Sequence, residues 1–148
     1  MPRNRQSPSG RRIQSGATFF QTAGVSVPSD AALTTALPFQ IVWGDLELLD
    51  GGLVLPPRGT FLLQARARFP SNATGWRALR VLWNFVDDAQ VFDDLVDTRP
   101  AVNGTVTTST GAIPWRTVDR AMRVRLGVRH TAGAPLSVSV GSISVIVL

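Results

Sequence analysis

Residues 60–69, Thr-Phe-Leu-Leu-Gln-Ala-Arg-Ala-Arg-Phe, carry the pattern that decides the fold. Every second position is apolar, and most positions between them are polar; the apolar set is Phe61, Leu63, Ala65, Ala67 and Phe69. Successive side chains of a strand point to opposite faces of a sheet. This period of two therefore predicts a strand with one buried face and one polar face.

The same alternation recurs twice downstream. It runs through Leu79, Val81, Trp83 and Phe85, and again through Met122, Val124, Leu126 and Val128. Residues 105–110 are rich in β-branched side chains and predict a further strand. Turn-forming residues separate these stretches, as in 50–52, 56–59, 70–72, 103–104 and 132–135. No window shows helical periodicity, so we predict an all-β protein with two antiparallel sheets, as a sandwich or barrel.

The C-terminal segment changes its apolar parity partway along. Leu136, Val138 and Val140 share one parity, whereas Ile143, Val145 and Val147 share the other. A slip of one residue exchanges the two faces of a strand, so we predict a break or bulge near Gly141-Ser142 and two separate strands. The last strand also carries Ile146 and Leu148 on its second face, which indicates cover by a neighbouring subunit.

Composition supports self-association. The chain has 148 residues, which is enough for one domain to bury most of the surface of its unfolded chain without the help of disulfides. It contains no cysteine. Charged residues make up 17% of the sequence, against about 25% in typical soluble proteins. No apolar run approaches the roughly 18 residues of a membrane-spanning helix, so we expect no membrane partner. A chain this poor in charge is expected to cover part of its surface with other chains.

The first residues have a different character from the rest. Residues 1–16 are rich in Arg, Ser, Pro and Gly and cannot build a core, so we expect an extended basic arm before a domain at 17–148. Four arginines without aromatic residues between them offer few contacts to a nucleic acid. We therefore favour a protein partner whose acidic groove binds the arm. The predicted partner-binding residues are Arg3, Arg5, Arg11, Arg12, Phe19 and Phe20.

Two features could carry chemistry. His130 is the only histidine, and nothing in the sequence supplies the oriented acid and nucleophile of a catalytic triad, so we expect no catalytic residue and no enzymatic activity. The acidic stretch at 87–97 places oxygen ligands in one predicted loop, as Ca²⁺ requires. Solvated acids, or acids paired with arginines of a neighbouring subunit, are favoured over this calcium alternative, and no other cofactor is expected; the residues are Asp87, Asp88, Asp93, Asp94 and Asp97.

Four segments together resemble the complement globular-head and tumour-necrosis-factor superfamily. Residues 56–65 are similar to the opening P-x-x-G-x-Y/F-x-x-x-A of a central strand, and residues 72–80 resemble N-A-T-G-x-R-x-L-R of phage and bacterial members. Residues 123–133 are similar to a later strand of that superfamily and the turn that follows it. Residues 142–148 are similar to its closing strand.

This resemblance implies a ten-strand jelly roll that forms a homotrimer. It also implies that residues 60–69, 122–130 and 142–148 share the inner sheet, which packs against neighbouring subunits. The expected trimer-interface residues are Leu62, Gln64, Arg66, Arg68, Arg123, Arg125, Ile146 and Leu148. A buried arginine needs a hydrogen-bond acceptor. We therefore expect carboxylates, carbonyl groups or water beside the four arginines of this set.

From these features we expect a non-enzymatic phage structural protein in the virion. The leading interpretation is a trimeric capsid decoration, or cement, protein whose arm docks on the major capsid protein or another virion protein. This interpretation takes into account that the short sequence begins with Met and shows no stalk. The alternative is a trimeric receptor-binding head at a phage tail or fibre tip that recognises a host sugar or protein.

Overall fold

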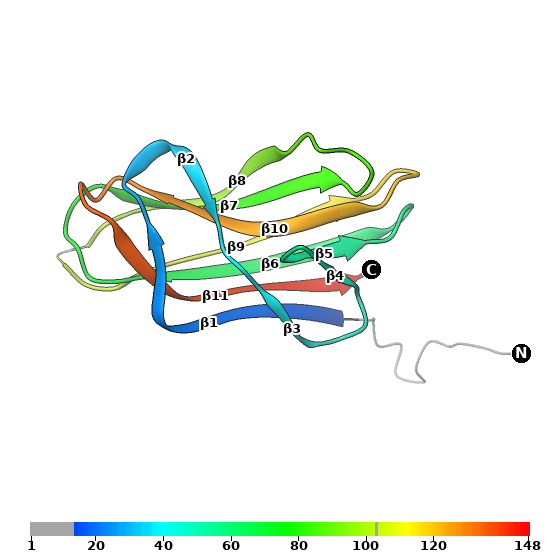
Figure 1. Cartoon of the computed structure of the whole chain (residues 1–148), viewed down its shortest axis with the longest axis horizontal. Helices are drawn as coiled ribbons and strands as arrows, with labels where there is room; N and C mark the ends of the chain where they lie inside the picture. Colours follow the sequence, from blue (N-terminus) through cyan, green and yellow to red (C-terminus); the bar gives the residue numbers. More distant parts are fainter. Residues whose placement is uncertain (1–13, 103) are drawn as a thin grey trace, which may run out of the picture.

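The computed structural model describes residues 14–102 and 104–148, and within them the side chains of all but residues 14–23, 40–42 and 140. These residues form eleven strands and no helix, so none of them provides a helix that could cross a membrane (Figure 1). The strands are β1 (Gln14–Val27), β2 (Asp30–Ala36), β3 (Gln40–Trp43), β4 (Leu48–Leu49), β5 (Gly52–Leu55), β6 (Thr60–Phe69), β7 (Trp76–Phe85), β8 (Phe92–Pro100), β9 (Thr107–Arg116), β10 (Met122–His130) and β11 (Leu136–Val147).

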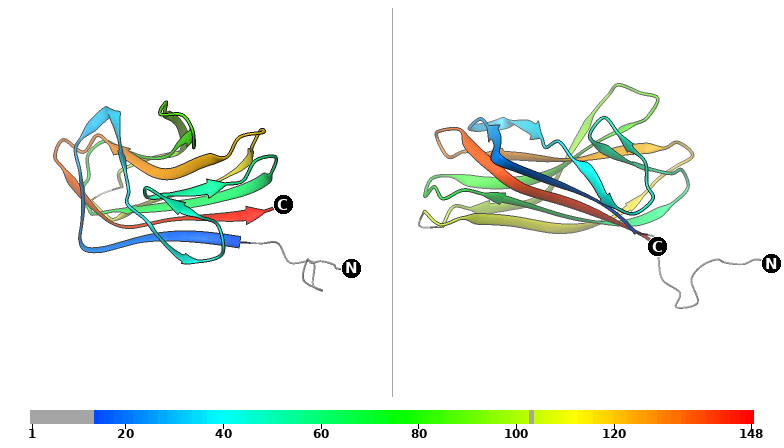
Figure 2. Two further views of the ribbon diagram at one scale, coloured as in Figure 1. Left: turned by 45° about the vertical axis from the view of Figure 1, so that its right-hand side comes forward. Right: turned by 60° about the horizontal axis from the view of Figure 1, so that its bottom comes forward.

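The strands form two antiparallel sheets that pack face to face (Figures 1 and 2). One sheet has the order β3-β1-β11-β6-β9, and the other has the order β4-β5-β10-β7-β8, with β2 also paired to β10. The all-β, two-sheet antiparallel fold is therefore as predicted. The eleven strands exceed the ten that the resemblance implied. The first of them, β1, begins at Gln14.

The core lies between the sheets and contains the alternating residues identified in the sequence. On β6, Phe61, Leu63, Ala65, Ala67 and Phe69 are all buried. Val81 on β7 and Val124 on β10 meet them from the opposite sheet and are completely buried. Burial of these apolar side chains removes them from water and supplies the main favourable free energy of folding.

The expected grouping of three strands in one sheet is wrong. β6 and β11 are neighbours, but β10 belongs to the opposite sheet, where it pairs with β7 from Met122 to His130 and with β5 from Met122 to Val124. Alternation shows which face of a strand is buried but not which sheet the strand joins. Arg123 and Arg125 therefore lie on the opposite outer surface from Arg66 and Arg68.

The C-terminal segment is one continuous strand, so the prediction of two separate strands is wrong, whereas a bulge, the predicted alternative to a break, is present in its pairing with β1 between Val138 and Val140. The change of parity itself is present, because Val138 and Gly141, three positions apart, both face the core. The partner strand absorbs the irregularity: Phe20 of β1 pairs with Val140, but Val25 pairs with Val138. A Cβ on Gly141 would lie 2.7 Å from the Leu37 Cδ1 atom, so glycine leaves room for Leu37 at this point.

The acidic stretch is mostly a strand, contrary to the predicted loop. Asp93, Asp94 and Asp97 lie on β8, and only Asp87 and Asp88 remain in the turn after β7. Packing overrides the low strand propensity of aspartate here, since Phe92 stacks on Trp83 with ring centroids 4.3 Å apart. β8 pairs with β7 along one edge of the sheet.

Candidate functional site

The outer surface of the sheet that contains β6 is called the β6 face below. The cross-strand register places its side chains in rows: Pro114, Leu62 and Ile146 form one row, and Ala112, Gln64 and Ser144 form the next. Leu62 and Ile146 are half-buried, and Leu148, just past the end of β11, is 57% exposed. This end of the face offers mainly apolar and small side chains to a partner, together with the exposed Arg116 in the next row, opposite Thr60.

The other end of the β6 face carries unpaired positive charge. Arg66 and Arg68 are exposed, and neither forms an ion pair with any residue the structure describes. Their neighbours across the strands are Thr110 and Ser142 for Arg66, and Thr108 for Arg68. The face therefore has cations but no acidic residue in these rows.

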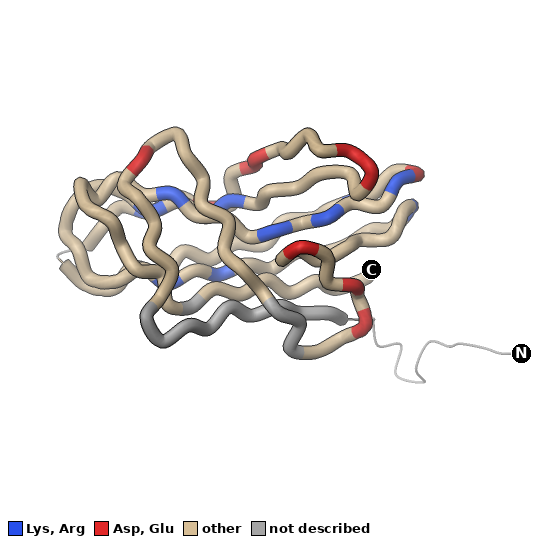
Figure 3. The backbone as a smooth tube through the Cα atoms, in the orientation of Figure 1, with Lys and Arg blue, Asp and Glu red and all other residues tan. Residues whose placement is uncertain are grey.

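The outer surface of the other sheet, called the β10 face below, is organised by Asp93. The Asp93 carboxylate accepts hydrogen bonds from Arg80 on β7, from Arg129 on β10 (2.8 Å) and from Thr34 on β2. Burial alone would raise the pKa of Asp93, but these three hydrogen bonds outweigh it and hold the pKa below its ordinary value. Asp93 thus ties three strands to β8. Figure 3 shows acidic and basic segments close together in this layer.

The other acids of the calcium alternative do not gather at one site: only Asp87 and Asp88 lie together, and both pair with Arg120. Asp87 pairs with Arg120 at 2.5 Å, and Asp97 pairs with Arg99 at 2.8 Å. Asp94 accepts a hydrogen bond from the indole nitrogen of Trp83 at 2.8 Å. No three acidic or histidine side chains among residues 24–148, as far as their side chains are described, gather closely enough to hold a metal ion. These carboxylates are engaged by cations or donors of the same chain.

His130 is buried at the end of β10. The backbone N–H of Ala132 donates to its Nδ1 (3.2 Å), so Nε2 carries the proton and donates to the Val27 carbonyl (2.7 Å). Burial lowers the pKa of His130, and the nearby Arg77 charge lowers it further against the opposing effect of the Val27 carbonyl. Both ring nitrogens are occupied by backbone groups, so neither is available for proton transfer to a substrate.

Arg77 is an organising residue that the sequence interpretation missed. It is completely buried, and its guanidinium donates to the carbonyls of Asn72 and Thr74, each at 2.8 Å, and of Trp76 at 3.2 Å. These bonds shape the 72–75 loop, in which Gly75 has φ +74°. The signal was present, because Arg77 shares the parity of the buried Leu79 on β7. Residues 72–80 therefore serve the fold at this end of the sandwich.

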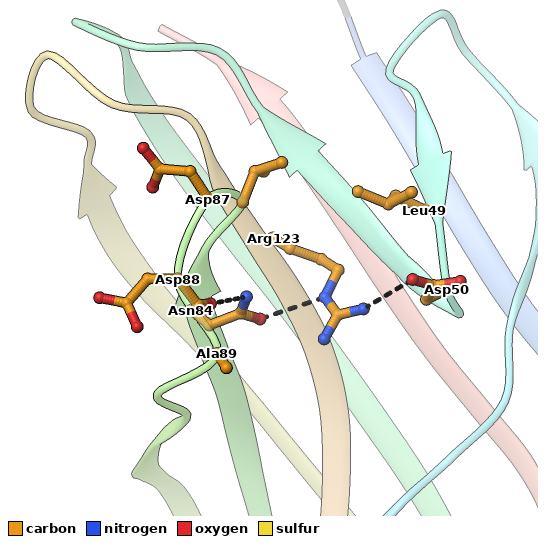
Figure 4. Close-up of a pocket in the computed structure, with 8 residues that line it drawn as sticks. Leu49, Asp50, Asn84, Asp87, Asp88, Ala89 and Arg123 are labelled. Atoms are coloured by element: carbon orange, nitrogen blue, oxygen red, sulfur yellow. Dashed lines mark hydrogen bonds and ion pairs between the residues drawn. The ribbon is translucent and has the colours of Figure 1, made fainter.

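A polar cleft opens at one end of the β10 face (Figure 4). It has a volume of about 370 Å³ and lies between the turn after β4 and the turn after β7. Arg123 lies between the two turns; its Nε donates to the Asn84 side chain at 3.1 Å, and its Nη1 lies 3.6 Å from the Asp50 carboxylate. The residues lining the cleft are Leu49, Asp50, Asn84, Val86, Asp87, Asp88, Ala89 and Arg123.

The structure divides the expected interface set between two surfaces. Leu62, Gln64, Arg66, Arg68 and Ile146 lie on the β6 face, with Leu148 at its edge, whereas Arg123 and Arg125 lie on the β10 face. The expected docking residues Arg3, Arg5, Arg11 and Arg12 lie outside the described residues. Phe19 and Phe20 belong to β1, but their side chains are not described.

Comparisons with known proteins agree with the fold. No protein-family model matches the sequence, and no curated protein matches it significantly. A crystal structure of murine APRIL at pH 5.0 superposes with a TM-score of 0.62 and 14% identity, over 91% of this chain and 99% of that chain. The structure of Eiger TNF from S. frugiperda superposes with a TM-score of 0.55 and 16% identity, over 93% of each chain. The chain thus has a fold similar to the jelly rolls of the tumour-necrosis-factor family.

Proposed function

We propose that this chain is a non-enzymatic structural protein that self-associates as a homotrimer through its β6 face. The observation that carries the proposal is the composition of that face. The face carries an apolar row of Pro114, Leu62 and Ile146 at one end and, further along β6, two arginines that form no ion pair with the described part of their own subunit. Interfaces are depleted in charge at their core and enriched in arginine, which forms bidentate contacts across them.

We further propose that the trimer decorates a phage capsid. The similarity of residues 72–80 to a segment of phage and bacterial members of the jelly-roll superfamily supports this proposal. The arm at 1–16 would then dock on the major capsid protein or another virion protein, with Arg3, Arg5, Arg11 and Arg12 contacting acidic groups. In this arrangement the β6 face holds the three subunits together and leaves the β10 face outward.

A receptor-binding head at a phage tail or fibre tip is the second candidate. The observation that favours it is the polar cleft beside Asp50 and Arg123, which is large enough for a small polar ligand. Carboxylate, amide and guanidinium groups in one cleft could hydrogen-bond to the hydroxyl groups of a sugar.

Removal of residues 1–12 distinguishes the two candidates. A decoration protein without these residues should lose binding to capsids in a co-sedimentation assay, whereas a receptor-binding head should retain adsorption to host cells. The Leu62→Asp variant tests the assembly face in the same preparations, because a charge within the apolar row should separate the subunits without disturbing the core. Full capsid binding by the truncated protein would contradict the decoration role.

A further inference from the structure

Arg125 is the one guanidinium of the β10 face that no described residue satisfies. It follows Arg123 by two positions on β10, so both point to the same side of the sheet. Its Nε is covered by neighbouring atoms and donates to nothing, whereas Arg80, Arg123 and Arg129 all have acceptors. Burial lowers the pKa of Arg125, as does the charge of Arg123 nearby, while Asp50 opposes both. A covered donor without an acceptor is costly. The Nε of Arg77 is in the same position, but the other nitrogens of Arg77 donate to three backbone carbonyls, whereas Arg125 donates to no described residue.

The aliphatic parts of the Arg123 and Arg125 side chains both lie against the neighbouring strand β5. β5 runs beside β10, and a Cβ on Gly52 would lie 2.7 Å from Cγ of Arg123 and 2.8 Å from Cγ of Arg125. Glycine therefore lets both stems lie directly over β5. Arg123 is also oriented by Asn84, a buried side chain whose amide donates to the carbonyls of Phe85 and Asp88.

The two cations share one weakly held carboxylate. Asp50 is the only described acid that forms an ion pair with either arginine, and its distance to Arg123 is 3.6 Å. Its side chain is 80% exposed at a hairpin tip where the backbone has φ 46°. The carboxylates of Asp87 and Asp88 point away from Arg123 in Figure 4, and both pair with Arg120. The local charge is therefore positive and incompletely balanced.

We propose that the Arg123–Arg125 pair is a binding site for an oxyanion, a carboxylate or phosphate group, which displaces Asp50. Planar guanidinium groups bind such groups through paired N–H donors, and stems already held in place lose little freedom on binding. A free phosphate or a carboxylate from a protein partner would present this same chemistry. The site lies on the opposite surface from the β6 face, so it does not depend on the proposed trimer.

Titration of the full-length protein with inorganic phosphate, and separately with acetate, tests this proposal. Chemical shifts of the arginine Nε–Hε groups should change for Arg123 and Arg125 and saturate in the millimolar range. Saturation by phosphate alone would assign the site to phosphate groups, and saturation by acetate as well would assign it also to carboxylates. No saturation by either anion would overturn the proposal.

Three variants locate the effect. Arg125→Gln should weaken binding about tenfold or more, because it removes a charge-assisted donor pair. Arg116→Gln removes an exposed arginine elsewhere and should bind as the unmodified protein does. Asp50→Asn should bind more tightly, since asparagine tolerates the positive φ but cannot compete as an anion. An equal loss in Arg125→Gln and Arg116→Gln, or weaker binding by Asp50→Asn, would contradict a site at this pair.

Discussion

The β6 face and the β10 face are built on similar antiparallel sheets but differ in whether their arginines form ion pairs within the subunit. On the β10 face, Arg80 and Arg129 both form ion pairs within the subunit with Asp93, which also accepts a hydrogen bond from Thr34. On the β6 face, Arg66 and Arg68 stand exposed with no ion pair to the described part of the chain. The difference indicates that one surface is largely complete in a single subunit and that the other requires a partner.

The largest effect should follow loss of the carboxylate that organises the β10 face. Asp93→Asn would leave two partly buried arginines without their counter-charge, and we expect it to lower the free energy of unfolding by about 2–3 kcal/mol. Urea denaturation followed by tryptophan fluorescence measures this change.

Asp94→Asn is the matched control for that experiment. Asp94 lies next to Asp93 on β8, but its carboxylate is exposed and accepts a single hydrogen bond from Trp83, which an amide oxygen can still accept. We expect its unfolding free energy to change by less than about 0.5 kcal/mol. Equal losses in the two variants would mean that Asp93 has no special place on the β10 face.

Acid should weaken the subunit through His130 and Asp93 while leaving the β6 face unaffected. The folded-state pKa of His130 lies below its ordinary value of 6.5, so the unfolded chain binds the proton first and stability falls as the pH drops below 6.5. The slope can reach about 1.4 kcal/mol per pH unit. Asp93, whose pKa is also lowered, stabilises the fold above pH 3.8, and this contribution is lost as the pH falls further.

The His130→Gln variant isolates the first of these two effects. Its unfolding free energy should vary less between pH 7 and pH 5 than that of the unmodified protein, whatever its absolute stability. Since the described rows of the β6 face contain no acid and no histidine, self-association should change little over the same range. An unchanged pH dependence in the variant would exclude His130 as the responsible group.

The smallest effect should come from the unpaired arginines. The double variant Arg66→Gln with Arg68→Gln removes exposed charges that have no acceptor in the described part of their own subunit. At concentrations where the chain is monomeric, we expect its unfolding free energy to change by less than about 0.5 kcal/mol. A loss comparable to that of Asp93→Asn would show that the β6 face is already stabilised within one subunit.

The sequence predicted the features that depend on alternation alone. The buried face of β6, from Phe61 to Phe69, and the core residues Val81 and Val124 follow from the period of two. The parity of Arg77 with Leu79 also pointed to its burial, although the general preference of arginine for the surface hid this signal.

Features that depend on long-range pairing could not be predicted. Alternation on β10 was correct, but its neighbours are β7 and β5, and only the three-dimensional pairing places Arg125 above Gly52. In the sequence, Asp93 was one of five aspartates in the acidic stretch at 87–97. Its role depends on Thr34, Arg80 and Arg129, which three other strands bring to it.

Sedimentation equilibrium of the full-length protein at neutral pH tests the central claim most directly. We predict the mass of three chains for the unmodified protein and the mass of one chain for the Ile146→Asp variant, with the same circular dichroism spectrum for both. A stable monomer with the β6 face open to water would contradict the claim that this surface requires a sister subunit.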